Sequence, residues 1–222
     1  MRKSIGLVMA LCILLIGCQS KPQESAQEET QQEATEQEAV ETEPVEPIDR
    51  PGEYAPYVAK EGDILIDIDV EGYGVITVAL LPELAPITAN HFAKLVENGT
   101  FDGLTFHRIM VGFMMQGGQP HDPSTELETI EGEFESNGHE NSISHTRGAI
   151  SMARTMEPNS ASQQFFIVQE NSTFLDGDYA GFGYVTEGIE LVDKICEEAV
   201  VIDNNGTVPP ENQPIINSIT LK

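Results

Sequence analysis

The chain contains 222 residues and carries 37 acidic against 11 basic side chains, which gives a formal net charge of −26. This length fits one domain with appendages, and the 40% share of hydrophobic residues is enough for a core. The acidic balance argues against nucleic acid as a partner, because its phosphates would repel the chain. It also disfavours electrostatic adhesion to an anionic lipid surface.

The N-terminus has the pattern of an export signal. Two basic residues precede an apolar run over residues 5–16, which is too short to be a comfortable membrane-spanning helix. The run leads into Gly17 and Cys18, and this junction resembles the lipobox of bacterial lipoproteins. The resemblance implies a signal peptide over residues 1–17, diacylation of Cys18 and a lipid anchor on the extracytoplasmic face of the cell membrane. Ordinary secretion with an incidental cysteine is the alternative interpretation.

An acidic, polar segment follows the cysteine. Residues 18–56 are mostly Gln, Glu, Ala, Thr and Ser, with almost no large apolar side chain that could form a core. The glutamates repel one another and extend the segment, and Pro44 and Pro47 stiffen its end. We expect a disordered tether that holds a folded domain, residues 57–222, away from the membrane.

The folded part opens with strands and one helix. Residues 64–70 alternate in their second half, residues 75–80 return after a Gly-containing turn, and both segments predict strands. Residues 86–97 begin with proline and place apolar side chains at helical spacing, which predicts a helix. Residues 104–109 predict a further strand.

The second half of the domain has fewer regular segments. Residues 120–147 are rich in Gly, Ser, Asn and acidic residues and predict long loops. Short strands are expected over 148–153 and 164–168, a helix over 186–196 and a closing strand over 215–221. Many short strands with two separated helices favour a mainly β fold, a closed antiparallel barrel capped by the two helices.

Three later segments carry the most specific pattern. They are FHRIMVGFMMQGG at 106–118, SMAR followed by PNSASQQFFI within 151–167, and FLDG followed by FG within 174–183. In order and spacing they closely resemble the cyclophilin family, and the resemblance covers residues 62–222. A lone Phe-His-Arg would be weak, but three segments in register are specific. The resemblance implies an eight-stranded cyclophilin-like barrel with peptidyl-prolyl cis-trans isomerase (rotamase) activity and no cofactor.

The residue types in these segments suit rotation of an X-Pro peptide bond. The rotation has a barrier of about 18–20 kcal/mol because it breaks amide resonance, and no bond of the chain is cut. A grip on the proline ring and a donor to the twisted amide therefore help, and neither a nucleophile nor a metal is needed. The resemblance implies that Arg108 is the catalytic donor and that Gln116 binds substrate and orients Arg108.

The same resemblance implies a wider binding surface. Its substrate-binding residues are Phe113, Met114, Ala153, Arg154, Gln164, Phe166, Phe174, Leu175 and Tyr179. Of these, Ala153 and Arg154 would pair with the peptide through their backbone. Better-known eukaryotic members carry Trp, His and Asn where this chain has Phe174, Tyr179 and Arg154. The variants resemble bacterial cyclophilins and should keep isomerase activity, but without the indole N–H they lose a donor for tight binding of cyclosporin.

Simpler interpretations of these residues remain open. The apolar members of the set could be ordinary core side chains, and Arg108 could form a surface ion pair. His107 could act as an acid or base, although its place in the motif favours a structural role. The five histidines show no metal spacing with Cys196, which favours no metal site and a small buried side chain at Cys196.

The sequence thus favours an exported isomerase that accelerates the folding of exported or surface proteins, since uncatalysed exchange takes about tens to hundreds of seconds. The alternative is a chaperone module that binds proline-containing segments with incidental turnover, and the pair Arg108 and Gln116 favours the enzyme. A solute-binding lipoprotein is disfavoured because no two-lobed pattern is visible. We expect a monomer whose partners are proline-containing polypeptides.

Overall fold

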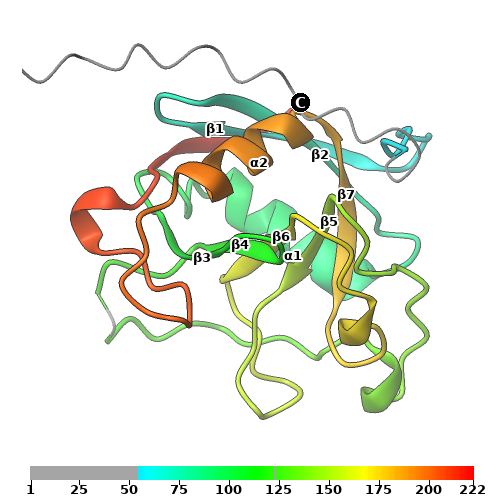
Figure 1. Ribbon diagram of the computed structural model, residues 1–222. Coiled ribbons are helices and arrows are strands. Elements are labelled where there is room, and N and C mark those ends of the chain that lie inside the picture. The colour runs from blue at the N-terminus through cyan, green and yellow to red at the C-terminus, as the bar shows by residue number, and fades with distance from the viewer. Residues whose placement is uncertain (1–54, 123) are drawn as a thin grey trace, which may run out of the picture. The chain divides into compact units, whose positions relative to one another are not determined.

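The computed structural model describes residues 55–122 and 124–222. The predicted signal peptide, Cys18 and nearly all of the predicted tether lie outside the described residues. The described chain forms one eight-stranded sheet with two α-helices and three short 3-10 helices (Figure 1). The strands are β1 (Ile64–Val70), β2 (Gly74–Leu80), β3 (Phe106–Met110), β4 (Met114–Gly117), β5 (Ala149–Met152), β6 (Phe165–Val168), β7 (Gly181–Glu187) and β8 (Ile216–Leu221). The helices are α1 (Pro86–Glu97), α2 (Ile189–Glu198), η1 (Glu135–Asn137), η2 (Thr173–Leu175) and η3 (Pro210–Asn212).

The sheet curls until its two edges meet. Its strand order is β3-β4-β6-β5-β7-β2-β1-β8, and neighbouring strands are antiparallel. The edges join at one isolated bridge between Thr105 and Ile215. Beside it, the Phe106 N–H donates to the Pro214 carbonyl at 3.0 Å. The mainly β fold of eight antiparallel strands is confirmed, and its closure is a short seam between β3 and β8 rather than a full ladder.

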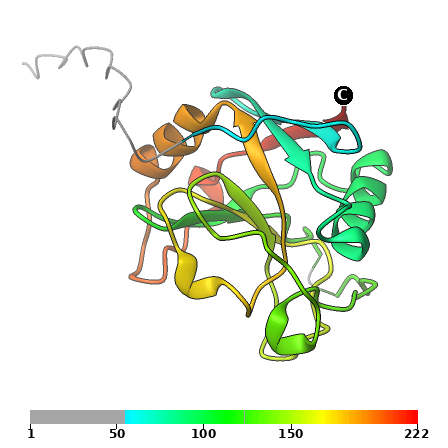
Figure 2. The ribbon, with the colours of Figure 1, turned by 90° about the vertical axis from the view of Figure 1, so that its right-hand side faces the viewer.

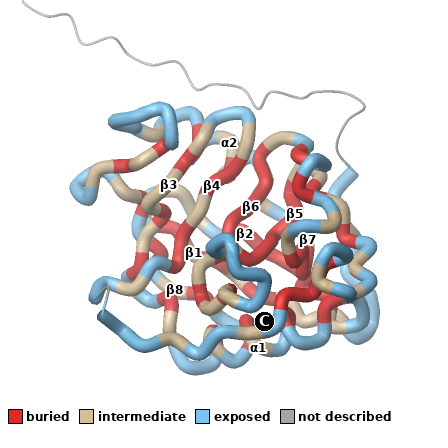
Figure 3. The backbone as a smooth tube through the Cα atoms, turned by 90° about the horizontal axis from the view of Figure 1, so that it is seen from below, coloured by how far each residue is buried: buried red, intermediate tan, exposed pale blue. Residues whose placement is uncertain are grey.

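The main core lies on the inner side of this curled sheet. Every strand and both α-helices contribute buried apolar residues to one cluster, and Figure 3 shows the buried strands surrounded by exposed loops. Aromatic rings fill much of it: the Phe92 ring centroid lies 4.8 Å from Phe101, 5.0 Å from Phe182 and 5.2 Å from Phe165. Rings at these distances add attraction to the area that they bury.

The two α-helices lie at opposite ends of the curled sheet (Figure 2). Helix α1 begins with Pro86, whose fixed φ suits the first helical turn, and it buries the face that includes Phe92 and Val96. Its own N-cap residue, Ala85, offers no side-chain acceptor. The carboxylate of Glu133 supplies one instead, since it accepts the N–H groups of Ile87 at 3.0 Å and Thr88 at 2.7 Å.

Most predicted elements match the structure. The strands expected over 64–70, 75–80, 148–153, 164–168 and 215–221 and the helix over 86–97 are present, with ends that differ by one residue at most. Within the second helix, Cys196 is fully buried, and burial raises the pKa of its thiol to about 12.

Two expectations for regular structure need correction, and two strands were not predicted. Residues 186–187 belong to β7 and not to the second helix, because Gly188 takes a left-handed φ of 85° that separates strand from helix. The strand expected over 104–109 begins only at Phe106 and extends to Met110. Strands β4 and β7 were not predicted from their own pattern, because both faces of β4 and most of β7 are buried and show no alternation.

None of the helices in residues 55–122 and 124–222 has the length and apolar character needed to cross a bilayer.

Candidate active site

The hairpin of β3 and β4 brings together the two predicted catalytic side chains. Arg108 and Gln116 are direct partners in its register, and Nη1 of Arg108 donates to Oε1 of Gln116 at 3.2 Å. Nε2 of Gln116 then donates to Oε1 of Gln164 at 3.0 Å. Because β4 also pairs with β6, which begins directly after Gln164, the three side chains form a polar row across neighbouring strands.

Two further contacts fix the guanidinium of Arg108. Its Nε donates to the backbone carbonyl of Asn205 at 2.8 Å, and its Nη2 contacts Sδ of Met110 at 3.0 Å. Each Nη atom therefore keeps one N–H bond that no described residue accepts. Among the described residues, no carboxylate lies within ion-pair distance of Arg108. The interpretation of this residue as a surface ion pair does not fit these contacts.

A second apolar cluster lies on the outer side of the same strands. Met114, Phe166 and Val168 alternate along β4 and β6 with residues of the main core, so they point to the opposite face of the sheet. This group, here called the Phe166 cluster, consists of buried Met114, Ala149, Phe166, Val168 and Leu175 with half-buried Met110, Phe113, Ala153, Tyr179 and Tyr184 packed against it. It adjoins the predicted catalytic pair, because Met110 belongs to it and touches Arg108.

Three larger side chains form the rim of the Phe166 cluster. The ring of Phe174 is 72% exposed and lies 5.6 Å from that of Phe113. Tyr179 presents an edge to Phe166 at 6.0 Å. The guanidinium of Arg154 lies 4.7 Å from the centre of the Tyr179 ring, and its Nε and Nη2 both donate to the Asp178 carbonyl.

The structure therefore brings all predicted site residues other than Cys18 into one contiguous group. The apolar members belong to a cluster separate from the main core; Met114, Phe166 and Leu175 are buried in it, whereas Phe174 is exposed. Cys18 lies outside the described residues. The individual catalytic and binding roles stay predictions.

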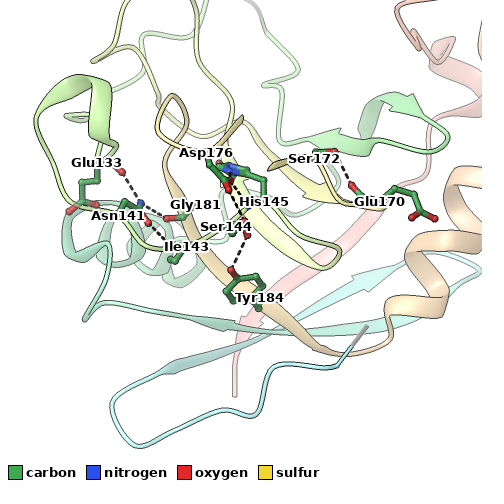
Figure 4. Close-up of polar contacts among 11 residues, drawn as sticks. Glu133, Asn141, Ile143, Ser144, His145, Glu170, Ser172, Asp176, Gly181 and Tyr184 are labelled. Atoms are coloured by element: carbon green, nitrogen blue, oxygen red, sulfur yellow. Dashed lines mark hydrogen bonds and ion pairs between the residues drawn. The ribbon is translucent and has the colours of Figure 1, made fainter. Parts of the chain in front are cut away.

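His145 is the site residue that the sequence reasoning missed. Its ring is fully buried and stacks on Phe166, with centroids 6.0 Å apart and planes 19° apart. Nδ1 lies 2.8 Å from Oδ1 of Asp176, and Nε2 lies 3.0 Å from Oγ of Ser151. Figure 4 shows His145 and Asp176 facing each other, with Ser144 between them and Tyr184. No local pattern marks His145, because its partners come from β5 and from the segment after η2.

The chemistry of these contacts assigns the tautomer of His145. An ionised carboxylate only accepts, so Nδ1 carries the proton and Nε2 accepts from the Ser151 hydroxyl. Burial lowers the pKa of the imidazole, against the opposing hydrogen bond and charge of Asp176. Burial alone would raise the pKa of the Asp176 carboxyl, but hydrogen bonds from Ser144 and His145 lower it overall. The ring is therefore neutral at neutral pH and supports Phe166 from below.

The order Ser151, His145, Asp176 resembles the triad of a serine hydrolase, but the resemblance stops at the geometry. Ser151 is fully buried within β5, so no substrate carbonyl reaches its Oγ. His107, the other histidine considered at this site, is half-buried. Burial and the Arg108 charge lower the pKa of His107. In residues 55–122 and 124–222 there is no group of His, Cys, Asp and Glu side chains that could hold a metal ion.

The family of this fold and site is shown by comparison with known proteins. The model of the family described as "Cyclophilin type peptidyl-prolyl cis-trans isomerase/CLD" matches residues 65–221, so the chain belongs to this family. It is a peptidyl-prolyl cis-trans isomerase of the cyclophilin type.

Relatives among characterised proteins and solved structures are similar over most of their own length. Peptidyl-prolyl cis-trans isomerase B of Bacillus subtilis is 46% identical over 114 residues, which are 50% of this chain and 76% of that protein. Peptidyl-prolyl cis-trans isomerase A of Dickeya dadantii is 38% identical over 146 residues, or 64% and 74% of the two chains. The crystal structure of a Cryptosporidium parvum cyclophilin type isomerase in the presence of the dipeptide Ala-Pro has a TM-score of 0.61 at 25% identity, and covers 71% of this chain and 98% of that one.

Proposed function

We propose that Arg108 catalyses the rotation of X-Pro bonds by donating a hydrogen bond to the prolyl nitrogen. In the planar amide the nitrogen lone pair is delocalised into the carbonyl, so the nitrogen is a poor acceptor. In the twisted transition state the lone pair becomes localised and can accept an N–H bond. A donor placed at this nitrogen therefore stabilises the transition state more than the ground state, and only such differential binding raises the rate.

The observation that carries the proposal is the placement of unused donors beside an apolar surface. The guanidinium of Arg108 is held at Nε, Nη1 and Nη2, yet each Nη retains a free N–H among the described residues. The Phe166 cluster adjoins it through Met110 and offers a platform for a proline ring. Gln116 and Gln164 continue the row with polar groups that can bind the peptide backbone.

A proline-isomer assay on the full-length chain with Arg108→Ala tests this mechanism. We expect kcat/KM to fall by about a hundredfold or more, as for loss of a single transition-state donor, with peptide affinity nearly retained. Lys94→Ala, an exposed cation on α1, is the matched control and should keep the parent rate. A parent rate equal to the uncatalysed background would overturn the isomerase function, and a fully active Arg108→Ala variant would overturn the mechanism alone.

We further propose that the isomerase is anchored through lipidated Cys18 to the extracytoplasmic face of the membrane, where it acts on proline-containing segments of exported or surface proteins. The support is the signal-like N-terminus and the acidic tether that follows it. The Cys18→Ser variant should leave the membrane fraction, whereas Cys12→Ser, within the apolar run, should remain there. Continued membrane association of Cys18→Ser would contradict the anchor.

A further inference from the structure

A short loop after α2 holds the catalytic arginine from outside its own hairpin. The loop covers residues 202–207 and folds back on itself, with the Ile202 N–H donating to the Thr207 carbonyl at 2.9 Å. It also docks along β3: Thr207 forms a bridge with Arg108, and the Ile109 N–H donates to the Gly206 carbonyl at 2.8 Å. This docking places the Asn205 carbonyl 2.8 Å from Nε of Arg108.

The conformation of this loop depends on the carboxylate of Asp203. Oδ1 accepts the backbone N–H groups of Asn205 at 2.9 Å and of Thr207 at 3.0 Å, and Oδ2 accepts the Thr207 hydroxyl at 2.8 Å. These bonds lower the pKa of the Asp203 carboxyl, with the Thr207 contributions the largest. The side chain of Asp203 thus holds Asn205, whose carbonyl binds Arg108, and also Thr207, two residues further along the chain.

The loop packs closely against β3 at Gly206. Gly206 has a φ of 81°, and a Cβ at this position would lie 2.3 Å from the Ile109 carbonyl oxygen. Any residue other than glycine at position 206 would clash with the Ile109 backbone, so the loop and β3 are in close backbone contact there. A loop freed by loss of the Asp203 bonds would therefore move away from β3, and the Asn205 carbonyl would move with it.

We propose that Asp203 is a positioning residue of the isomerase, which acts through the Asn205 carbonyl to orient the guanidinium of Arg108. With Nε held by the loop and Nη1 held by Gln116, the plane of the guanidinium is fixed from two sides before substrate arrives. The unused N–H bonds then point in a set direction, and preorganised donors of this kind cost no rearrangement during the reaction. The inference rests on the proposed role of Arg108 and adds a residue outside the motifs of the family.

The test compares Asp203→Ala with Asp203→Asn and Asp122→Ala in the full-length chain. Asp122 is a matched control, because its exposed carboxylate makes the same kind of local turn with Ser124 at 2.9 and 2.7 Å, and it has no contact with Arg108. We expect Asp203→Ala to lower kcat by about tenfold with KM unchanged, as a small misplacement of a catalytic group does. Asp203→Asn keeps one acceptor oxygen for the two backbone N–H groups and should restore most of the rate, and Asp122→Ala should equal the parent.

Two further measurements separate this inference from the mechanism on which it rests. In the Arg108→Ala background, Asp203→Ala should cause no additional loss of rate, because it acts through the missing side chain, whereas general damage to the fold would add. In NMR spectra, the Nε–H signal of Arg108 should shift and exchange faster with water in Asp203→Ala but not in Asp122→Ala. An unchanged signal together with an unchanged kcat overturns the role of Asp203. A changed signal without any effect of Arg108→Ala on the rate overturns the catalytic role of Arg108 instead.

Discussion

The protonation state of His145 affects the apolar part of the site, because the His145 ring packs against Phe166. Its ring supports Phe166, while Nδ1 is hydrogen-bonded to the Asp176 carboxylate and Nε2 to the Ser151 hydroxyl. Protonation would place a charge in a fully buried position, which is costly even beside Asp176. Protonation of His145, which lies next to the predicted proline site, should therefore contribute to unfolding at low pH.

The lowered pKa of His145 predicts a loss of stability below about pH 6.5, the value of an unperturbed histidine. Between that pH and the lowered pKa of the folded state, the unfolded state binds the proton and the folded state does not. The free energy of unfolding therefore decreases as the pH is lowered through this window. One proton contributes at most about 1.4 kcal/mol per pH unit in this window. Urea unfolding of the full-length chain at pH 7.5, 6.5 and 5.5 measures the slope.

The His145→Gln variant should show a smaller slope than the parent in the same experiment. His121→Gln, which changes an exposed histidine, should keep the parent slope. A residual slope is expected in both variants, because burial also lowers the pKa of His107. Equal slopes in the parent and His145→Gln would contradict the assignment to His145.

Helix α1 illustrates how an element depends on a residue far along the chain. Its sequence supplies the first-turn proline and an apolar face but no N-terminal acceptor. The acceptor is Glu133, which is 3% exposed and is positioned by the loop between β4 and β5. Within that loop, Nδ2 of Asn141 donates to the carbonyls of Glu133 at 2.7 Å and of Gly181, the first residue of β7, at 2.9 Å (Figure 4).

We expect Glu133→Ala to lower the free energy of unfolding by about 2 kcal/mol or more, because two helix N–H groups lose a charged acceptor in a buried place. Glu131→Ala is the neighbouring control. Glu131 forms only an exposed pair with His139, so its loss should cost no more than about 0.5 kcal/mol. Chemical denaturation measures both variants, and equal values would show that Glu133 does not cap α1.

The junction of β7 and α2 depends on glycine. Gly188 has a φ of 85°, and a Cβ there would lie 2.8 Å from the Val75 carbonyl oxygen. Gly188→Ala should therefore destabilise the protein by at least about 1 kcal/mol more than Gly138→Ala. Gly138 has the same φ but no atom near its Cβ position, so it carries the conformational cost without the clash. Thermal unfolding of the two variants tests the difference.

How much of the fold and of the site the sequence could predict depended on how far apart along the chain the interacting residues lie. Strands β1 and β2, helix α1 and the predicted active-site residues carry signals within short segments, as periodicity or as motifs that resemble the family. His145, Glu133 and the loop at Asp203 act through partners that only the folded sheet brings near, such as Asn205 beside Arg108. Their own segments contain no periodic pattern, and polar residues in loops look alike until their partners are known. Strand β4 was missed for a related reason, because burial on both faces removes alternation.

For the whole molecule, negative charge is the dominant electrostatic feature. The chain carries a net charge of −26, and arginines 108 and 154 at the site lack carboxylate partners among the described residues. Arg147, by contrast, is paired with Asp193. Repulsion among the carboxylates that have no basic partner favours expanded states of the chain. It therefore destabilises the short seam between β3 and β8 that closes the sheet.

This charge predicts that moderate salt stabilises the protein. Between 10 and about 150 mM NaCl the Debye length falls from about 30 Å to about 8 Å, which screens repulsion between separate carboxylates. The thermal unfolding midpoint of the full-length chain should rise over this range. The rise should be smaller in a Glu126→Lys, Glu128→Lys variant, which reverses two exposed charges. A midpoint that falls with salt would indicate that attractive pairs outweigh the repulsion.

The exposed ring of Phe174 also makes the site observable by fluorescence. The chain contains no tryptophan, so its intrinsic emission comes from tyrosine alone. Phe174→Trp would add a single indole at the rim of the Phe166 cluster, next to Phe113. Its emission would respond to the arrival of a peptide without interference from any other indole. The same position thus offers a built-in optical reporter, with which substrate residence times could be followed in real time.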